Sequence, residues 1–409
     1  MFCALSQGSS SMKHTTRENR CGHVPAVRNL TLATMGFSWL PVASMAIYVA
    51  VFGVATAEAA ERQAAAGTVS VTKVVGELDV PWALAFLPDG GFLVTERSGR
   101  LLHFDSSLRR TGVSGVPDVL DKGQGGLLDL AVARDFPRSR EIFLTFSKPY
   151  RNGRRGGTAL ASATLSDDNT RLSDVKLLFE MGRPTTGGRH FGSRVVEAPD
   201  GTLFVTIGDR GKRDTAQDLS VHNGKIVRLG RDGSIPRDNP FAGVANARSE
   251  IWSLGHRNPQ SLALDDRGTI WAVEHGPKGG DEINRIAKGL NYGWPIIGYG
   301  RHYSGAKIGV GQSKEGLEQP AFHWDPSIAP SGLMIYSGRL WPEWSGHFFV
   351  GSLKLDHVSR LKPGSRFEEE ERLAFPETDR VRDVREAPDG SIWFLSEGHG
   401  AVFRIAPVP

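Results

Sequence analysis

The chain has 409 residues, with 49 lysines and arginines against 45 aspartates and glutamates, which gives a formal net charge of +4. So small an excess over this length argues against a nucleic-acid-binding protein. The length allows two ordinary domains or one large domain built from repeats. The 49 glycines and 23 prolines, set among many short β-like runs, favour an all-β fold.

Residues 1–60 have the layout of a secretory signal peptide. Basic residues precede a stretch from Asn29 to Ala57 that contains no charged residue, and ATAEAA at Ala55–Ala60 offers small residues at the spacing of a cleavage site. A true start at Met12 or Met35 would explain the long polar leader. The alternative is an uncleaved anchor, since the uncharged stretch is long enough to span a bilayer. We therefore expect a periplasmic or secreted protein that touches the membrane only if this segment stays attached.

Both cysteines of the chain, Cys3 and Cys21, lie in this leader. An exported chain would then contain no disulfide, no thiol nucleophile and no thiolate metal site. We interpret residues 61–68 as a short polar linker and residues 69–409 as the folded domain.

One pattern then recurs along the chain: an apolar strand, a turn that is often Pro-Asp-Gly, and a second apolar strand. Proline fixes φ at the first corner of such a turn, and glycine accepts the positive φ that follows. The copies lie at Pro81–Asp105, Leu127–Lys148, Val195–Asp209, Leu262–Gly276, Gly332–Lys354 and Val384–Ile405.

Six such units over the domain predict a six-bladed β-propeller, in which radial repetition protects the sheet edges. We expect the last strand, Val402–Ile405, to complete a blade together with residues around Val69–Lys73. In propellers the central channel and the loops at one end carry function, so we expect the ligand site at the top of the channel.

Polar residues gather in the glycine-rich turns that flank these strands. Each also has an ordinary explanation: a histidine before a strand is a common loop hydrogen-bonder, and a carboxylate in a turn caps that turn. Arg380 and Arg382 share one face of a strand, and they have Asp379 and Asp383 as possible ion-pair partners. The candidates that precede or end a strand are Gln124, His190, Arg257, Asn258, Gly276, Pro277, Asp281, Lys354, Arg380 and Arg382.

Taken together, these residues predict a site for an anion. Lys354, Arg380 and Arg382 facing one cavity would need a negative ligand to offset their repulsion and desolvation, and the arginine fork suits a carboxylate. The turn at Gly276-Pro277 could present backbone carbonyls to a hard cation such as Ca²⁺. The implied ligand carries several carboxylates.

A series of short motifs resembles one known family. In order these are GQGGLLDLA, HFGSR, GHRNPQSL, EHGPKGGDEIN, NYGWP, PSIAPSG, GSLK and RVRDV. They resemble the soluble aldose sugar dehydrogenases that depend on pyrroloquinoline quinone (PQQ), the glucose/sorbosone dehydrogenase family. The resemblance runs from about Val71 to the end of the chain, and it implies a six-bladed propeller that binds the quinone and Ca²⁺ at the top of the channel.

The resemblance also implies roles for individual residues. His190 is the expected general base toward the C1 hydroxyl of the sugar, and a ring with a pKa near neutrality suits that task. Arg257 is expected at the quinone carbonyl, where it would stabilise the negative charge that develops. The implied cofactor contacts are Arg257, Asn258, Lys354, Arg380 and Arg382. The implied Ca²⁺ ligands are the carbonyls of Gly276 and Pro277. The implied substrate contacts are Gln124, Asp281 and Trp324.

The expected activity is the oxidation of aldoses at C1 to lactones in the periplasm, with an unidentified electron acceptor. The glucose-oxidising branch of the family has an acid where this chain has Arg189, and Asp325 beside Trp324 is an apparent insertion, so the preferred sugar stays open. We expect a monomer or a weak dimer.

Two alternatives remain. A propeller lactonase would use Ca²⁺ and activated water, and would need clustered carboxylate ligands in the channel. A non-catalytic propeller would bind sugar or protein, and would not need both His190 and Arg257.

Overall fold

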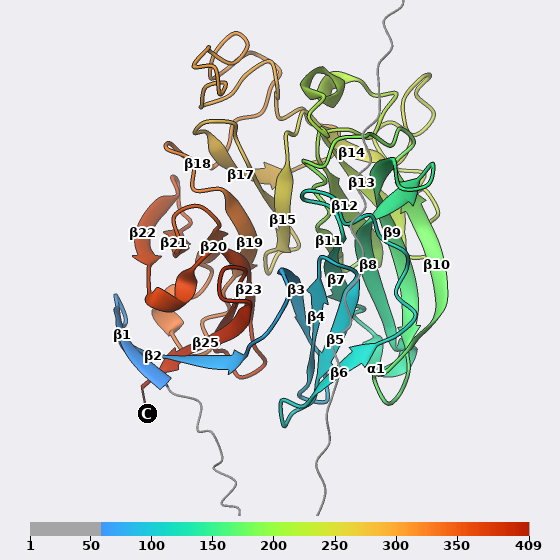
Figure 1. The fold of residues 1–409 in the computed structure, drawn as a ribbon. Helices are drawn as coiled ribbons and strands as arrows, with labels where there is room; N and C mark the ends of the chain where they lie inside the picture. The colour runs from blue at the N-terminus through green and yellow to red at the C-terminus, as the bar shows by residue number, and fades with distance from the viewer. Residues whose placement is uncertain (1–58, 409) are drawn as a thin grey trace, which may run out of the picture. The chain divides into compact units, whose positions relative to one another are not determined.

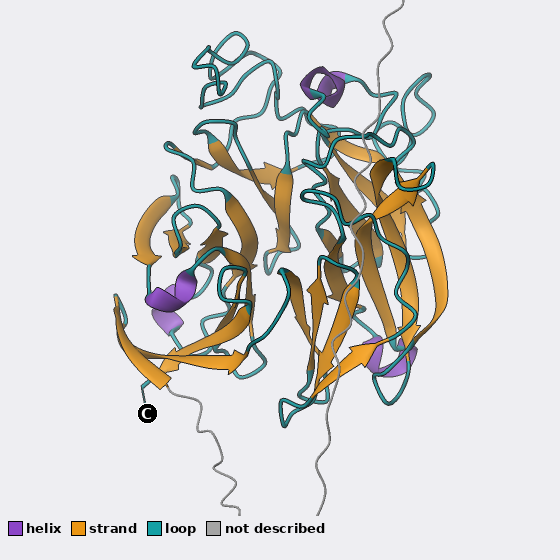
Figure 2. Cartoon of the chain, in the orientation of Figure 1, coloured by secondary structure: helices purple, strands orange, loops and turns teal. Residues whose placement is uncertain are grey.

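The computed structural model describes residues 59–408, whose regular secondary structure is almost entirely β-strand (Figures 1 and 2). All but the last two residues of the expected signal segment lie outside the described part of the chain. Between residues 59 and 408 no helix is long and apolar enough to cross a membrane.

The strands form six sheets, which we number as blades in chain order. Blade 1 contains β3 (Pro81–Phe86), β4 (Phe92–Glu96), β5 (Arg100–Phe104) and β6 (Arg110–Val113). Blade 2 contains β7 (Leu127–Val132), β8 (Glu141–Tyr150), β9 (Arg155–Leu165) and β10 (Leu172–Glu180). Blade 3 contains β11 (Val195–Glu197), β12 (Thr202–Ile207), β13 (Lys225–Gly230) and β14 (Ile251–Leu254).

Blade 4 contains β15 (Pro259–Leu264), β16 (Ile270–Glu274), β17 (Asp281–Ile286) and β18 (Phe322–Trp324). Blade 5 contains β19 (Pro330–Ile335), β20 (Phe348–Ser352), β21 (Val358–Lys362) and β22 (Glu368–Leu373). Blade 6 contains β23 (Val381–Glu386), β24 (Ile392–Ser396), β25 (Ala401–Pro407), β2 (Gly67–Val75) and β1 (Ala59–Ala64). The described helices are short: α1 (Phe136–Ser139), η1 (Arg213–Gln217), η2 (Pro342–Trp344) and η3 (Pro376–Thr378).

The first strand of each blade lies on the inside of a closed ring. β3, β7, β11, β15, β19 and β23 contact one another in that order, and β23 returns to contact β3. The predicted six-bladed propeller is therefore confirmed. The predicted closure is confirmed as well, because β2 pairs antiparallel with β25 and places Val71 opposite Ile405.

The Pro-Asp-Gly turns have the chemistry expected of them. Asp89 accepts the N–H of Gly91, Asp200 accepts that of Thr202, and Asp389 accepts that of Ser391. The glycines that follow these aspartates take φ values of 79° to 86°, a region that favours glycine. Each turn joins the first two strands of a blade at the same end of the propeller.

The prediction of a linker at residues 61–68 is wrong. Residues 59–64 form β1, which pairs with β2 from Ala59↔Thr72 to Ala64↔Gly67. Arg62 also makes an ion pair with Glu377 in η3. The polar alternation of this segment fits an edge strand with one solvated face, and the segment adds a fifth strand to blade 6.

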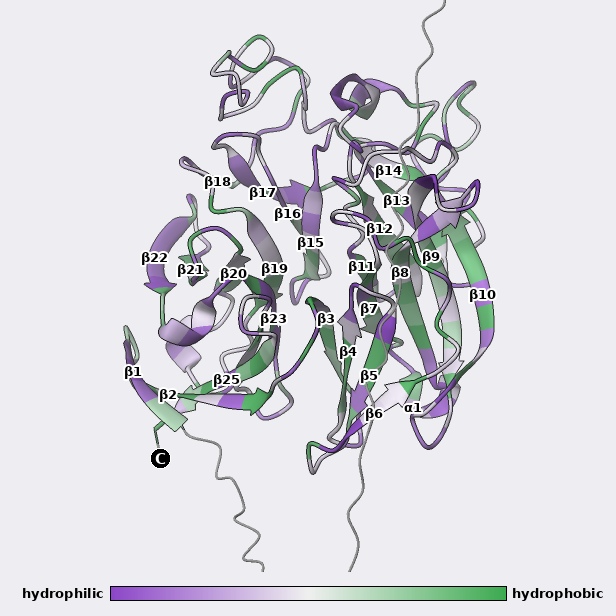
Figure 3. Cartoon of the chain, viewed as in Figure 1, coloured by the Kyte–Doolittle hydropathy of each residue, from purple (hydrophilic) through white to green (hydrophobic). Residues whose placement is uncertain are grey.

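The core lies between neighbouring blades, where apolar side chains of facing strands interlock. One cluster joins blades 1 and 2 around Leu93 and Phe146, and another joins blades 5 and 6 around Phe349 and Phe394. Hydrophobic residues are concentrated in β7, β8 and β9 (Figure 3). Because the strands are fixed on both faces, the turns at their ends are held on a rigid frame.

Antiparallel pairing explains where functional residues gather. The start of each inner strand lies opposite the end of the second strand, as in Pro81↔Glu96, Pro259↔Glu274 and Val381↔Ser396. The turn before the inner strand and the turn after the second strand of every blade therefore lie at one end of the channel. We call this end the site end.

Candidate functional site

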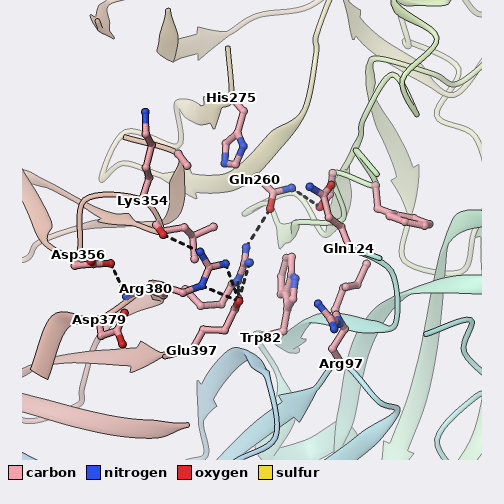
Figure 4. A pocket seen from close by; sticks show the side chains of 16 residues that line it. Trp82, Arg97, Gln124, Gln260, His275, Lys354, Asp356, Asp379, Arg380 and Glu397 are labelled. Atoms are coloured by element: carbon pink, nitrogen blue, oxygen red, sulfur yellow. Dashed lines mark hydrogen bonds and ion pairs between the residues drawn. The ribbon is translucent and has the colours of Figure 1, made fainter. Parts of the chain in front are cut away.

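A cavity of about 630 Å³ opens at the site end of the channel (Figure 4). Its size is within the range of small-molecule sites. All six blades contribute to its wall. The lining residues are Trp82, Arg97, Gln124, Leu128, Phe191, Gly192, Gln260, His275, Ala329, Leu353, Lys354, Asp356, Asp379, Arg380, Arg382 and Glu397.

Arg380 and Arg382 meet in this cavity, as predicted from their spacing, but they do not pair with Asp379 and Asp383. Both form two-pronged ion pairs with Glu397, one on each carboxylate oxygen, with Nη2–O distances of 2.8 Å. Burial raises the pKa of Glu397, but Arg382 and Arg380 outweigh it and hold that pKa at about 2. Glu397 is thus the anion that offsets the two arginines in the protein itself.

The balance of charge in the cavity still favours an anionic ligand, though less strongly than the cations alone suggested. Four cations line it, Arg97, Lys354, Arg380 and Arg382, against the carboxylates of Asp356, Asp379 and Glu397. The exposed Lys354 ammonium makes no ion pair with any described carboxylate. Trp82 adds a flat apolar wall on which the guanidinium of Arg382 lies 5.8 Å from the ring centroid. A planar polycarboxylate fits such a lining.

His190 forms a pair with Asp209 beside this cavity. Nδ1 of His190 lies 2.6 Å from Oδ1 of Asp209. A carboxylate only accepts, so Nδ1 carries the proton and Nε2 of the neutral ring keeps a free lone pair. Asp209 is itself fixed by Trp294 Nε1 at 2.9 Å and by the N–H of Gly211. The pair holds the imidazole in the tautomer that a general base needs.

Burial lowers the pKa of His190 below its ordinary value, and the charges of Arg257 and Arg189 lower it further, while the hydrogen bond to Asp209 opposes them. The ring is consequently neutral at pH 7. His190 also has a positive φ of 55°, a strained conformation for a residue with a side chain. Its N–H donates to Oε1 of Gln124 at 2.7 Å, which links this residue to the cavity wall.

A close approach of two backbones brings the pair together. A Cβ at Gly208 would lie 2.2 Å from the carbonyl oxygen of His190, so only glycine permits Asp209 to reach the ring. Sequence reasoning missed Asp209 and Glu397. Both follow the second strand of a repeat, as Lys354 does, and that shared position was the signal that could have found them.

Arg257 and Asn258 are buried directly before β15. Arg257 Nη1 donates to the carbonyl of His275, and its guanidinium lies 5.5 Å from the Trp294 ring centroid. Oδ1 of Asn258 accepts the N–H of Gly192 at 3.2 Å. Asn258 thus fixes the segment that follows His190, and Arg257 faces a smaller hollow next to the main cavity.

That hollow contains the candidate cation ligands. It has room for about one water-sized species, at ≈ 20 Å³, and its wall includes Gly276, Pro277, Glu274 and Glu282. No described N–H or O–H is hydrogen-bonded to the carbonyl of Gly276 or Pro277. Free carbonyls beside carboxylates are the donors that Ca²⁺ prefers, so these residues fit the predicted ion.

The structure corrects the expectation that Asp281 and Trp324 contact substrate. Asp281 is fully buried, and its oxygens accept the N–H groups of Gly276, Ile328 and Ala329 and the hydroxyl of Ser327. Trp324 is packed in the core between blades 4 and 5, and its Nε1 donates a hydrogen bond to Oε1 of Glu369 at 3.1 Å. Neither lines the cavity. Asp281 instead holds the turn that presents Gly276.

The fold and these turns define the chain as a β-propeller with a polar ligand site at one end of its channel. A family model described as glucose/sorbosone dehydrogenase matches residues 78–404. The chain belongs to this family.

Two relatives that cover most of the chain carry the name of a sugar dehydrogenase. It is 43% identical over 351 residues to the aldose sugar dehydrogenase YliI of Escherichia coli (strain K12), which covers 84% of this chain and 94% of the relative. It is 30% identical over 409 residues to the quinoprotein glucose dehydrogenase B of Acinetobacter calcoaceticus, which covers 79% of this chain and 84% of the relative.

Solved structures show the same fold. The apo form of the soluble aldose sugar dehydrogenase of Escherichia coli superposes with a TM-score of 0.80 at 42% identity, over 83% of this chain and 100% of that one. The PQQ-bound form of an aldose sugar dehydrogenase from Streptomyces coelicolor superposes with a TM-score of 0.68 at 26% identity, over 86% of this chain and 99% of that one.

Proposed function

We propose that this protein is a periplasmic quinoprotein that oxidises aldoses at C1 to lactones with the help of PQQ and Ca²⁺. The observation that carries the proposal is the His190–Asp209 pair, because it sets a neutral imidazole with a free Nε2 at the mouth of the channel. Membership in the glucose/sorbosone dehydrogenase family supports the reaction class.

The proposed reaction removes a proton and a hydride from the sugar. Nε2 of His190 takes the proton of the C1 hydroxyl, and Asp209 stabilises the imidazolium that forms. Gln124, which holds the N–H of His190, lies at the cavity edge where it could also contact sugar hydroxyls. The C–H electrons leave as hydride, and C1 becomes the carbonyl carbon of the lactone.

PQQ, when bound, would supply the hydride acceptor. Lys354, Arg380 and Arg382 would hold its carboxylates in the central cavity, and Trp82 would cover one face of a planar ring. Arg257 would stabilise negative charge that develops on the acceptor, with Asn258 positioning the adjoining segment. The carbonyls of Gly276 and Pro277 would hold Ca²⁺.

The test is reconstitution of the purified protein. Titration with PQQ in the presence of Ca²⁺ is followed by absorbance and by quenching of tryptophan fluorescence, and dye reduction is then measured with a panel of aldoses. We expect saturable binding and sugar-dependent reduction. Absence of quinone binding in both optical signals would refute the proposal.

Two variants separate binding from chemistry. His190→Gln is expected to bind PQQ normally while its turnover falls by about 10²- to 10⁴-fold; full turnover would refute only the role of His190. Replacing Arg380 and Arg382 by glutamine is expected to weaken PQQ binding, because the carboxylates of the ligand lose their partners. Exposed Arg138, in α1, and Arg171, on the turn between β9 and β10, lie at the opposite end of blade 2 and are the control pair.

The alternatives predict other outcomes. A lactonase requires clustered carboxylate metal ligands in the channel, and residues 59–408 hold no group of three or more His, Cys, Asp or Glu side chains placed for a metal. A lactonase would hydrolyse lactones in the absence of PQQ. A non-catalytic propeller would bind sugar without reducing the dye. Cell fractionation and sequencing of the mature N-terminus test export, and analytical ultracentrifugation tests whether the protein is a monomer or a weak dimer.

A further inference from the structure

A second cleft, of about 540 Å³, lies beside His190 on the outer side of the site end. Its wall is built by the segment that follows β10, by the turn that follows β12 and by η1, and it includes Arg155, Arg183, Arg189, Arg210 and Lys212. A neighbouring groove of about 490 Å³ continues past Arg155 along the turn between β8 and β9. Both volumes lie within the range of small-molecule sites.

This cleft and groove, which we call the basic cleft, contain cations without carboxylates. None of the lining residues is Asp or Glu. No cation of the basic cleft is within 4 Å of a carboxylate among residues 59–408, whereas the nearby Lys148 and Arg213 both have acidic partners. The cations are Arg151, Arg154, Arg155, Arg183, Arg189, Arg210 and Lys212.

Arg210 provides an independent sign that an anion belongs here. It is only 2% exposed, and its buried Nε has no hydrogen-bond partner. Its terminal nitrogens donate to the carbonyls of Gly187 and Arg189, and its guanidinium lies 3.4 Å from the ring centroid of Phe191. Burial lowers the pKa of Arg210 to about 9, so the group stays charged at neutral pH. The charge of Asp209 opposes this lowering but forms no ion pair with Arg210, and a buried cation that is not ion-paired is costly.

The basic cleft is joined to the expected catalytic residue by the chain itself. Gly187 and Arg189 line the basic cleft, Phe191 and Gly192 line the central cavity, and His190 stands between them. On the other strand turn, Asp209 holds His190 while Arg210 and Gly211 line the basic cleft. A sugar whose C1 lies at His190 therefore has the cations within reach of its far side.

We propose that the basic cleft binds an acidic group of the substrate, so that the preferred aldoses carry a carboxylate or phosphate, as acidic oligosaccharides and sugar phosphates do. The inference rests on the proposed function, because it takes His190 as the position of C1. Guanidinium forks bind both kinds of oxyanion. The concave form of the cleft favours a small acidic saccharide over the convex surface of an acidic protein.

The test compares neutral and acidic aldoses of similar size. Steady-state kinetics of the PQQ- and Ca²⁺-loaded protein are measured with glucose, maltose, glucuronate, digalacturonate and glucose 6-phosphate, and calorimetry measures binding of the acidic sugars to the protein without PQQ. We expect kcat/KM to be about tenfold or more higher for an acidic sugar, equivalent to one strong charged contact. The uronates and the sugar phosphate distinguish carboxylate from phosphate.

The variant replaces Arg155, Arg183 and Lys212 by glutamine, since these line the basic cleft and are not adjacent to His190. KM for acidic sugars is expected to rise about tenfold, with kcat and all constants for glucose little changed. Arg138→Gln with Arg171→Gln is the matched control. Added salt should lower the preference for acidic sugars in the unmodified protein.

The outcomes separate the two proposals. Oxidation of glucose and acidic sugars with equal kcat/KM, together with no calorimetric binding, would overturn the basic cleft and leave the proposed function standing. Calorimetric binding that the variant loses, without oxidation of any aldose, would overturn the substrate assignment and the proposed function while an anion site remained. Binding of polyglutamate but of no acidic sugar would overturn the assignment in favour of an acidic protein partner.

Discussion

The His190–Asp209 pair shows how a single residue's environment decides its chemistry. An exposed histidine would be partly charged near neutral pH. Here burial first, and then the neighbouring Arg257 and Arg189, lower the pKa of His190, and Asp209 supplies the opposing interaction. Asp209 restores part of the basicity that burial removes, and it fixes the tautomer, so the ring is both neutral and oriented.

Replacing Asp209 by asparagine is expected to change the pH dependence of the reaction. The base acts deprotonated, so kcat/KM falls as pH drops through the pKa of His190. Without the raising effect of Asp209 that pKa falls further, and the acid limb moves to lower pH. The plateau also drops by about 10²-fold or more, because Nδ1–H is no longer held. A profile of kcat/KM against pH measures both; an unmoved limb would show that Asp209 only packs.

Glu397 is expected to stabilise the protein in a pH-dependent way. Its pKa is held at about 2 by Arg382 and Arg380, below the 4.5 of a free glutamate. A depressed pKa contributes stability above the unfolded value, and this contribution is lost as pH falls from about 4.5 to about 2. Glu397→Gln should therefore lower the free energy of unfolding by on the order of 2 kcal/mol at pH 7, and the difference should shrink on acidification.

Urea unfolding at several pH values measures this effect. Glu77→Gln is the control, because Glu77 is exposed and lies 3.7 Å from Arg110 in a surface ion pair. Such pairs contribute roughly 0–1 kcal/mol. A constant difference between Glu397→Gln and the unmodified protein from pH 7 down to about pH 2 would contradict the assignment of the low pKa to Glu397.

At the scale of elements, the repeat explains which site residues sequence reasoning could find. Turns before inner strands and after second strands lie at one end, so Gln124, His190, Arg257 and Lys354 were predicted to converge, and they do lie at that end. The repeat predicts at which end of the channel a residue lies, but it does not predict how far from the channel that residue lies. Asp281 and Trp324 lie on the third and fourth strands of blade 4, and are therefore displaced outward into structural roles.

The partners of the cations escaped prediction for a related reason. Arg380 follows Asp379 directly in sequence. Its backbone turns, however, with a positive φ of 46°, and its guanidinium reaches Glu397 just after β24. Proximity in sequence therefore suggested Asp379, while the antiparallel pairing of β23 and β24 supplies Glu397. Ion pairs across a sheet follow register, which composition does not reveal.

Asp281→Asn is expected to loosen the turn that presents the carbonyls of Gly276 and Pro277. The aspartate accepts four hydrogen bonds from two segments. The NH₂ group of asparagine would instead face some of the groups that donate these bonds, and those bonds would be lost. We expect a loss of about 2–4 kcal/mol of stability and weaker Ca²⁺ binding, measured by urea unfolding and calorimetry. Exposed Asp266, on the turn between β15 and β16, provides the control. Unchanged Ca²⁺ affinity would mean that the carbonyls are not the ligands.

At the scale of the molecule, the ring of inner strands is tied together by a buried network of charge. Arg194 of blade 3 reaches Asp129 of blade 2 at 2.8 Å and Asp383 of blade 6 at 3.0 Å, and its Nε donates to the carbonyl of Gln260 in blade 4. Asp383 in turn accepts the N–H of Leu84 in blade 1. Arg194 also stacks on Trp82, with its guanidinium carbon Cζ 4.3 Å from the ring centroid. Because Trp82 lines the cavity, the network lies directly beneath it.

Arg194→Met should therefore destabilise the whole propeller more than any surface ion pair would. The substitution keeps apolar volume but removes one of the two arginines that contact both Asp129 and Asp383, so that Arg385 alone offsets the two buried carboxylates. We expect a cost of about 3 kcal/mol. The unfolding midpoint in urea should fall while the slope stays constant. Arg404→Met, which breaks the exposed pair with Asp389, should cost at most about 1 kcal/mol. Adding Asp383→Asn to Arg194→Met should recover part of the loss, because Arg385 then has one buried carboxylate to offset and not two. A further loss of the full single-mutant cost would show that Asp383 acts through Leu84 alone.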